Sequence, residues 1–296
     1  MITIMGATGN TGRIAAETLL QAGKKVRVLG RSLDRLKPLA DKGADAMAGS
    51  ISDSAFLAKA FRESTAVYTL IPPDYAAPDY RAYQTRAGEA IASAVRESGV
   101  RHVVLLSSIG AQHASGTGPI AGLHEQEKRL SSIPGLNALF LRAGYFFENH
   151  FASLGLIKHQ GINGSAIRGD VPIAMIASRD VGAAAANALL KLDFKGPTVR
   201  EALGAADLTM DEVTHIIGET LQHPGLRYVE FPYEAALEGM LGMGLSKSIA
   251  SLYVEMSRGV NEGLVVSVEG RNAKNTTPTR FEDFARTVLA PAFGMM

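Results

Sequence analysis

Cysteine is missing from this chain of 296 residues, which excludes disulfide bonds, thiolate catalysis and cysteine-ligated metal sites. An excess of charge is missing as well, because 30 basic and 29 acidic residues give a net charge of +1 at pH 7. Without a basic patch we expect no nucleic-acid partner and no attraction to an anionic membrane. No apolar run approaches the ~18–20 residues of a membrane helix. Met1 leads directly into the first predicted strand, so we expect no signal peptide and a cytoplasmic protein.

Short apolar runs alternate with amphipathic stretches through the first half of the chain, a pattern that predicts βαβ units and a parallel sheet. Six strands are expected, within the segments ITIM, KVRVLGR, ADAMAG, AVYTLIPP, HVVLLSS and NALFLRAG. The predicted fold class is α/β, a Rossmann-type doubly wound parallel sheet over residues 1–149. A smaller, partly interleaved C-terminal α+β region, residues 150–296, would bind substrate, and a segment near 171–204 is expected to return to the Rossmann domain. The turn-rich stretch GINGSAIRGDV predicts a small hairpin.

A glycine-rich turn follows the first predicted strand in the stretch GATGNTG, with glycines at Gly6, Gly9 and Gly12. The first turn of a helix leaves backbone N–H groups unpaired, and its dipole favours negative charge there. Gly6 would permit the tight turn, Gly9 would let a pyrophosphate approach the main chain, and Gly12 would allow close helix–strand packing. Small polar donors stand between the glycines, namely Thr8, Asn10 and Thr11. A purely structural turn is the alternative, but the flanking strand and helix favour a dinucleotide.

The end of the second predicted strand indicates which dinucleotide is bound. A carboxylate at this position would accept hydrogen bonds from the adenosine ribose and repel a 2′-phosphate. The chain has Gly30-Arg31-Ser32 there, and a guanidinium holds a phosphate bidentately. A solvated arginine at a strand end is the alternative. We expect Arg31 to select NADP(H).

Several segments, in order along the chain, resemble landmarks of the NmrA-like family of atypical short-chain dehydrogenase/reductases. They are GATGNTGR, LGRS, VRHVVLLSSIGA, LFLRAGYFFENHF and TPTRFEDFAR. The resemblance implies NADPH-dependent reduction of quinones or dyes, or dinucleotide binding without catalysis in a redox-sensing regulator. It also implies that Ser50, where relatives commonly hold an aspartate, faces the adenine, and that Ile71 and Pro72 lie beneath the cofactor.

One position departs from the wider superfamily, whose members carry Tyr-x-x-x-Lys on the helix after the fifth strand. This chain reads His124-Glu125-Gln126-Glu127-Lys128 there. The resemblance implies that Lys128 holds the nicotinamide ribose. The i, i+4 spacing places His124 on the same helix face as Lys128, and an imidazole can donate a proton near neutral pH. We therefore predict His124 and Lys128 as catalytic residues, with a solvated or structural His124 as the alternative.

Two further groups of residues are candidates for the nicotinamide end. Ser107 ends the fifth strand, at the sheet edge where doubly wound folds bind ligands. An aromatic segment after the sixth strand would form an apolar wall for a flat acceptor, or else hydrophobic core. Its candidate substrate-binding residues are Tyr145, Phe146, Phe147 and Asn149. The histidines have no acidic companions at ligand spacing, so we predict no metal.

These observations predict an NADPH-dependent reductase that transfers hydride to a flat, electron-poor small molecule such as a quinone. The missing tyrosine favours the alternative, a non-catalytic NADP(H)-sensing regulator that binds a partner protein. The aromatic segment favours the reductase. The sequence is also compatible with a homodimer and identifies no particular acceptor.

Overall fold

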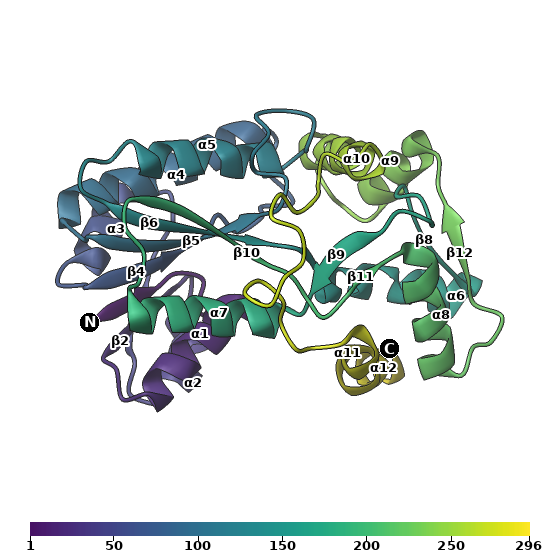
Figure 1. The fold of residues 1–296 in the computed structure, drawn as a ribbon, viewed down its shortest axis with the longest axis horizontal. Coiled ribbons are helices and arrows are strands. Elements are labelled where there is room, and N and C mark those ends of the chain that lie inside the picture. The colour runs from purple at the N-terminus through teal and green to yellow at the C-terminus, as the bar shows by residue number, and fades with distance from the viewer.

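The computed structural model describes residues 1–296 and divides into a larger and a smaller lobe (Figure 1). The larger lobe is built on a seven-stranded sheet in the order β10-β6-β5-β4-β1-β2-β3. Every strand pair in it is parallel. Its strands are β1 (Ile2–Ile4), β2 (Val26–Gly30), β3 (Asp45–Ala48), β4 (Ala66–Thr69), β5 (His102–Ser108), β6 (Asn137–Ala143) and β10 (Pro197–Ala202). The order reverses at β1, and this confirms the predicted Rossmann-type sheet.

Helices cover both faces of this sheet (Figure 1), which is why its central strands are mostly apolar. One face carries α1 (Asn10–Gln21), α2 (Leu33–Ala40) and α7 (Ser178–Lys191). The other face carries α3 (Ser54–Phe61), α4 (Tyr80–Ser98) and α5 (Ile120–Ser131). Each face has its own core: Leu19 and Val28 belong to the first, and Phe61 and Ile91 to the second.

The helix α7 and the strand β10 belong to the larger lobe, although they follow a strand of the smaller one. The strand β9 (Ile173–Ile176) lies in the smaller lobe. The helix α7 then packs against α1 with Gly182 at the contact, where a Cβ would lie 2.6 Å from the carbonyl oxygen of Thr11. The chain continues into β10, which pairs with β6 at the edge of the large sheet. The two lobes are therefore interleaved in sequence.

The smaller lobe contains two short sheets, β11-β9-β7 and β12-β8, and the remaining helices. The prediction of a hairpin in residues 161–171 is wrong, because β8 pairs in parallel with the distant β12. The stretch from Tyr233 to Asn261 forms two helices with a break after Gly242, where Gly244 adopts a φ of +88°. Besides β9, the smaller lobe contains the elements β7 (Tyr145–Phe146), α6 (Leu154–Gln160), β8 (Ile162–Ser165), β11 (Asp207–Leu208), α8 (Met210–Leu221), β12 (Arg227–Glu230), α9 (Tyr233–Gly242), α10 (Lys247–Asn261), α11 (Phe281–Phe284) and α12 (Ala290–Gly294).

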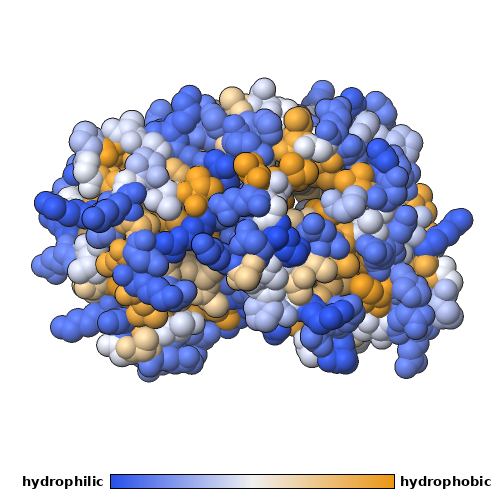
Figure 2. All heavy atoms as spheres, in the orientation of Figure 1, coloured by the Kyte–Doolittle hydropathy of each residue, from blue (hydrophilic) through white to orange (hydrophobic).

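Residues 263–279, which we call the strap, connect α10 to α11 and cross the junction between the lobes (Figure 1). Figure 2 shows polar and apolar residues interspersed on this face of the molecule, with several apolar residues where the lobes meet. None of the helices combines the length and the apolar character that crossing a bilayer would require.

Candidate functional site

One large cavity, of about 1520 Å³, runs along the carboxyl ends of the parallel strands. Residues that follow β1, β2, β3, β4, β5 and β6 line it, and residues of the smaller lobe close it at one end. In doubly wound folds this edge is where ligands bind, since the loops diverge there on either side of the point at which the strand order reverses. The cavity is therefore the candidate site.

The glycine-rich turn forms the middle of the cavity floor. Gly6 has a φ of +62°, and its carbonyl oxygen accepts a 2.9 Å hydrogen bond from the N–H of Gly9. Gly9 is the N-cap of α1 and has no side chain to cap the helix. The N–H groups of the first turn therefore have no side-chain partner at the helix end that borders the cavity. A Cβ at Gly12 would lie 2.4 Å from the carbonyl oxygen of Gly6. Gly12 does not line the cavity and instead permits this close packing.

The polar residues of the turn all line the cavity, namely Thr8, Asn10 and Thr11. The buried Tyr68 of β4 donates a 2.9 Å hydrogen bond to the Thr11 hydroxyl, which fixes that side chain from below. Burial raises the pKa of Tyr68 well above its ordinary value, so its hydroxyl keeps its proton and remains a donor. The turn thus combines unpaired helix N–H groups with held hydroxyl groups, a combination suited to binding an anion.

Two cations lie at the β2–β3 end of the cavity. Arg31 follows β2, Arg35 lies in the first turn of α2, and both residues are exposed along the cavity wall. Neither guanidinium forms a hydrogen bond or an ion pair with another residue of the chain, so both are available to an anionic ligand. Ser50 follows β3 and also lines this end, where its hydroxyl accepts a 3.2 Å hydrogen bond from the N–H of Ser52.

Ile71, Pro72 and Ser107 line the middle of the cavity, after β4 and β5. Tyr83 donates a 2.6 Å hydrogen bond to the carbonyl oxygen of Pro72 and so secures the loop after β4. Burial raises the pKa of Tyr83 to about 12. The Ser107 hydroxyl donates a 2.5 Å hydrogen bond to the carboxylate of Glu127 on α5.

The structure does not bring His124 and Lys128 to the cavity wall. His124 Nδ1 lies 2.9 Å from the carbonyl oxygen of Ala111. Lys128 is 63% exposed, and its ammonium lies 3.5 Å from the carboxylate of Glu125. Ile120 and Leu123 are the residues of α5 that line the cavity. His124 is nevertheless turned to the carbonyl oxygen of Ala111 and Lys128 to Glu125 and solvent, so neither residue of the pair predicted as catalytic lines the cavity.

Tyr145, Phe146 and Asn149 line the cavity after β6, but Phe147 does not. Phe147 is 1% exposed and belongs to the core of the smaller lobe. Its ring packs edge-on against Phe281, with the centroids 5.1 Å apart. Phe147 begins the 3₁₀ helix Phe147–Ser153, and its side chain packs into the core while its neighbours Phe146 and Glu148 remain at the cavity wall.

Several residues of the cavity wall were not predicted from the sequence. They come from the loop after β4, from α4, from the 3₁₀ helix Phe147–Ser153 and from the strap, namely Asp74, Tyr75, Tyr80, Tyr83, Glu148, Phe151 and Val265. Burial raises the pKa of Tyr80 and of Tyr145 well above the ordinary value. Glu148 accepts a 3.0 Å hydrogen bond from the N–H of Ser178 at the start of α7. The end of the cavity formed by the residues after β6 is thus aromatic, and the charged side chains of the cavity wall other than Arg31 and Arg35 are the carboxylates of Asp74 and Glu148.

A parallel sheet whose order reverses at the first strand, with a glycine-rich turn at that point, defines a Rossmann-type α/β protein. Within that class, the chain belongs to the NmrA-like family, whose model matches residues 1–285.

Comparison with known proteins identifies two curated relatives that are reductases. The (4-alkanoyl-5-oxo-2,5-dihydrofuran-3-yl)methyl phosphate reductase of Streptomyces griseus is 30% identical over 241 residues, which cover 81% of this chain and 80% of the relative. The NAD(P)H azoreductase of Xenophilus azovorans is 27% identical over 301 aligned residues, which cover 99% of each.

Among solved structures, the NADPH-dependent quinone oxidoreductase QOR2 of Escherichia coli, complexed with NADPH, shares the fold. It superposes with a TM-score of 0.80 at 21% identity, over 100% of this chain and 99% of that one. At this level of identity the likeness concerns the fold.

Proposed function

We propose that the cavity binds NADP(H) across the carboxyl edge of the sheet. The pyrophosphate would lie on the glycine-rich turn at the start of α1, because that turn presents unpaired N–H groups and the positive end of a helix dipole. The adenosine 2′-phosphate would lie against Arg31 and Arg35, and the adenine near Ser50. The nicotinamide would then reach past Ile71 and Pro72 to Ser107. NADPH-bound QOR2 has this fold.

We propose further that the protein is a reductase acting on a flat, uncharged, electron-poor acceptor such as a quinone. The observation that carries this proposal is the continuity of the cavity from the anion-binding turn to the aromatic wall. Both curated relatives are reductases by name. Apart from Arg31 and Arg35, the charged side chains of the cavity wall are the carboxylates of Asp74 and Glu148, which favours an uncharged acceptor over a phosphate ester because like charges repel.

Bound NADPH would supply the hydride. The chain would hold the acceptor between Tyr75, Tyr145 and Phe146, in line with the nicotinamide. A quinone that receives a hydride needs one proton to complete its reduction. No histidine or lysine lines the cavity, so we propose that the proton comes from water.

The second candidate function is a regulator that binds NADP(H) without turnover and contacts a partner protein. It is favoured by a specific observation: the superfamily's catalytic tyrosine position holds His124, which lies outside the cavity wall. This alternative uses the same nucleotide site and needs no acceptor.

Two measurements on the purified protein separate the candidates. Calorimetry with NADPH tests binding, and the loss of NADPH absorbance tests turnover with uncharged quinones, azo dyes and a phosphate-bearing enone. We expect binding, and turnover that is fastest with the uncharged quinones. Binding with no turnover on any acceptor would favour the regulator, and absence of binding would overturn both candidates.

A further inference from the structure

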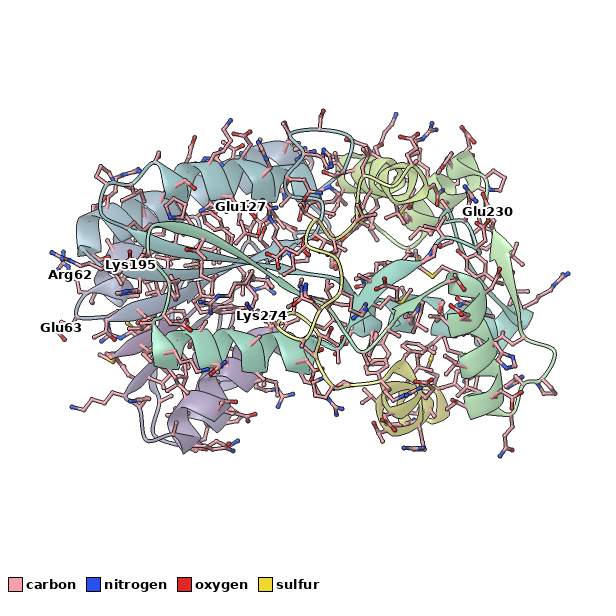
Figure 3. All side chains as sticks on the ribbon, viewed as in Figure 1. Arg62, Glu63, Glu127, Lys195, Glu230 and Lys274 are labelled. Carbon is pink, nitrogen blue, oxygen red and sulfur yellow. The ribbon has the colours of Figure 1, made fainter.

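A buried group of three polar side chains lies directly behind the cavity wall at the end of β5. Ser107 and Arg142 are paired neighbours on β5 and β6, and Glu127 comes down from α5 above them (Figure 3). Ser107 is 3% exposed, and the side chains of Glu127 and Arg142 are 8% and 11% exposed. Only Ser107 of the three lines the cavity.

The hydrogen bonds within this group run in one direction. Arg142 donates to both oxygens of Glu127, from Nε to Oε1 at 3.0 Å and from Nη2 to Oε2 at 2.6 Å. Ser107 Oγ lies 2.5 Å from the same Oε1. A carboxylate held by a guanidinium in a bidentate pair has no proton to give, so the hydroxyl of Ser107 must be the donor.

This arrangement determines what Ser107 offers to a ligand. A hydroxyl has one proton and two lone pairs, and the proton of Ser107 is committed to Glu127. The side chain therefore presents only hydrogen-bond acceptor capacity to the cavity. It is not a proton donor to the acceptor molecule, and its partner in the cavity must carry an N–H or O–H group.

We infer that Ser107 accepts a hydrogen bond from the carboxamide NH₂ of the nicotinamide, and that Glu127 and Arg142 are positioning residues that fix this polarity. The inference rests on the proposed binding of NADP(H). Strand order supports it, because β5 lies on the opposite side of β1 from β2 and Arg31. A dinucleotide with its pyrophosphate on the turn after β1 and its 2′-phosphate at β2 extends its nicotinamide over β4 and β5.

The test compares NADPH with its reduced 3-acetylpyridine analogue, in which a methyl group replaces the carboxamide NH₂ while the carbonyl is kept. Calorimetry gives the dissociation constant of each nucleotide. The wild-type protein should bind NADPH about fivefold more tightly than the analogue, the difference expected for one net hydrogen bond. Ser107→Ala should bind both equally, and its affinity for the analogue should match that of the wild type, which also reports an intact fold.

Two further variants test the role of the positioning residues. Glu127→Leu with Arg142→Met removes both charges together and frees the Ser107 hydroxyl. The freed hydroxyl can donate to the carbonyl that both nucleotides share, so the preference should fall toward unity. Ser131→Ala is the matched control, because its hydroxyl bonds only the backbone carbonyl of Glu127, and it should keep the wild-type ratio.

Equal affinities for the two nucleotides in the wild type, or a preference that persists in Ser107→Ala, would overturn the inference while leaving the proposed cofactor in place. A preference that survives in the double variant would overturn the assigned role of Glu127 and Arg142. Failure of both nucleotides to bind the wild type would overturn the proposed function itself, and the inference with it.

Discussion

At the scale of single residues, Arg31 and Arg35 make a direct prediction about cofactor choice. Both are exposed cations on the cavity wall without an acidic partner, and a charge-assisted hydrogen bond contributes about 1.5–3 kcal/mol. Arg31→Ala should therefore weaken NADPH binding by about 10- to 100-fold and leave the affinity for NADH nearly unchanged. Dissociation constants of both nucleotides measure the effect.

The control for this prediction is Arg62→Ala. Arg62 is an equally exposed arginine, at the end of the larger lobe far from the junction of the lobes (Figure 3), and it does not line the cavity. Its removal should leave both affinities at the wild-type value. An unchanged NADPH-to-NADH ratio in Arg31→Ala would refute the assignment of the 2′-phosphate site.

His150 makes a prediction about stability and pH. It is 4% exposed, its Nε2 has no hydrogen-bond partner, and burial lowers its pKa to about 4. The unfolded chain binds a proton near pH ~6.5, whereas the folded protein does not until about pH 4. Because the unfolded chain takes up this proton first, the free energy of unfolding falls as the pH drops below ~6.5. His150 should lower it by about 2 kcal/mol between pH ~7.5 and ~5.

Urea unfolding at these two pH values checks the prediction. His150→Leu should lose less stability on acidification than the wild type, by about that same 2 kcal/mol. His159→Leu, which replaces an exposed histidine of the neighbouring helix, should behave as the wild type does. An identical pH dependence in all three proteins would contradict the assignment to His150.

Some residues of the site could be predicted from the sequence and others could not. The glycine-rich turn and Arg31 could be predicted because backbone geometry and strand ends fix their place along the chain. The face of α5 could not, because which residues turn inward depends on how the helix packs. Arg142 was the available signal for Glu127: a charge inside the apolar strand LFLRAG requires a buried partner.

At the scale of elements, the contact between α1 and α7 predicts that replacing a glycine by alanine destabilises the protein. Alanine in place of a mid-helix glycine normally stabilises by about 0.5–1 kcal/mol. At Gly182 of α7 a Cβ would instead lie 2.6 Å from the carbonyl oxygen of Thr11 and 2.8 Å from Cβ of Ile14. Gly182→Ala should destabilise the protein by about 1–3 kcal/mol through overpacking and, by displacing the first turn of α1, weaken NADPH binding.

Gly239→Ala is the matched substitution, because Gly239 lies within α9 and a Cβ there would meet nothing within 4 Å. It should raise the free energy of unfolding by the ordinary propensity difference. Denaturant unfolding of both variants measures the contrast, and equal effects at the two positions would show that the α1–α7 contact is not tight.

Strands could be predicted where the local hydrophobic pattern of the sequence is enough to identify them. All six strands predicted in the first half were found; five of them are largely buried apolar runs, and the sixth, β3, is a partly exposed edge strand. The seventh, β10, is an edge strand that alternates exposed and partly buried residues, and it was not predicted. The strand β8 finds its partner β12 more than 60 residues later, a pairing that local pattern does not encode.

At the scale of the whole molecule, the strap joins the two lobes and contributes to the cavity. It carries Val265 to the cavity wall, where this residue also packs against Gly110 of the larger lobe. The strap bonds in turn to the residue after β10: Leu203 donates a 2.7 Å hydrogen bond to the carbonyl oxygen of Asn275 and accepts one of 2.7 Å from the N–H of Thr277. The order of this segment therefore depends on the edge strand of the large sheet.

Glu201 of β10 is the principal side-chain anchor of the strap. Its buried carboxylate accepts a 2.8 Å hydrogen bond from the N–H of Val268 and others from the Ser267 hydroxyl and the Glu269 N–H. Hydrogen bonds to a charged acceptor contribute about 1.5–3 kcal/mol each. Glu201→Ala should consequently accelerate amide hydrogen exchange across residues 264–270 by about a hundredfold, without comparable change in the central strands.

The loosened strap should affect the two ligands differently, because Val265 lies at the aromatic end of the cavity and Arg31 at the other. Glu201→Ala should raise the KM of the acceptor severalfold, as expected when a wall residue loses its fixed position, while the dissociation constant of NADPH stays near the wild-type value. Lys274→Ala is the control, since Lys274 is an exposed residue of the same segment whose ammonium forms no ion pair (Figure 3). An equal rise in both constants for Glu201→Ala would place the strap over the whole cavity rather than over its acceptor end.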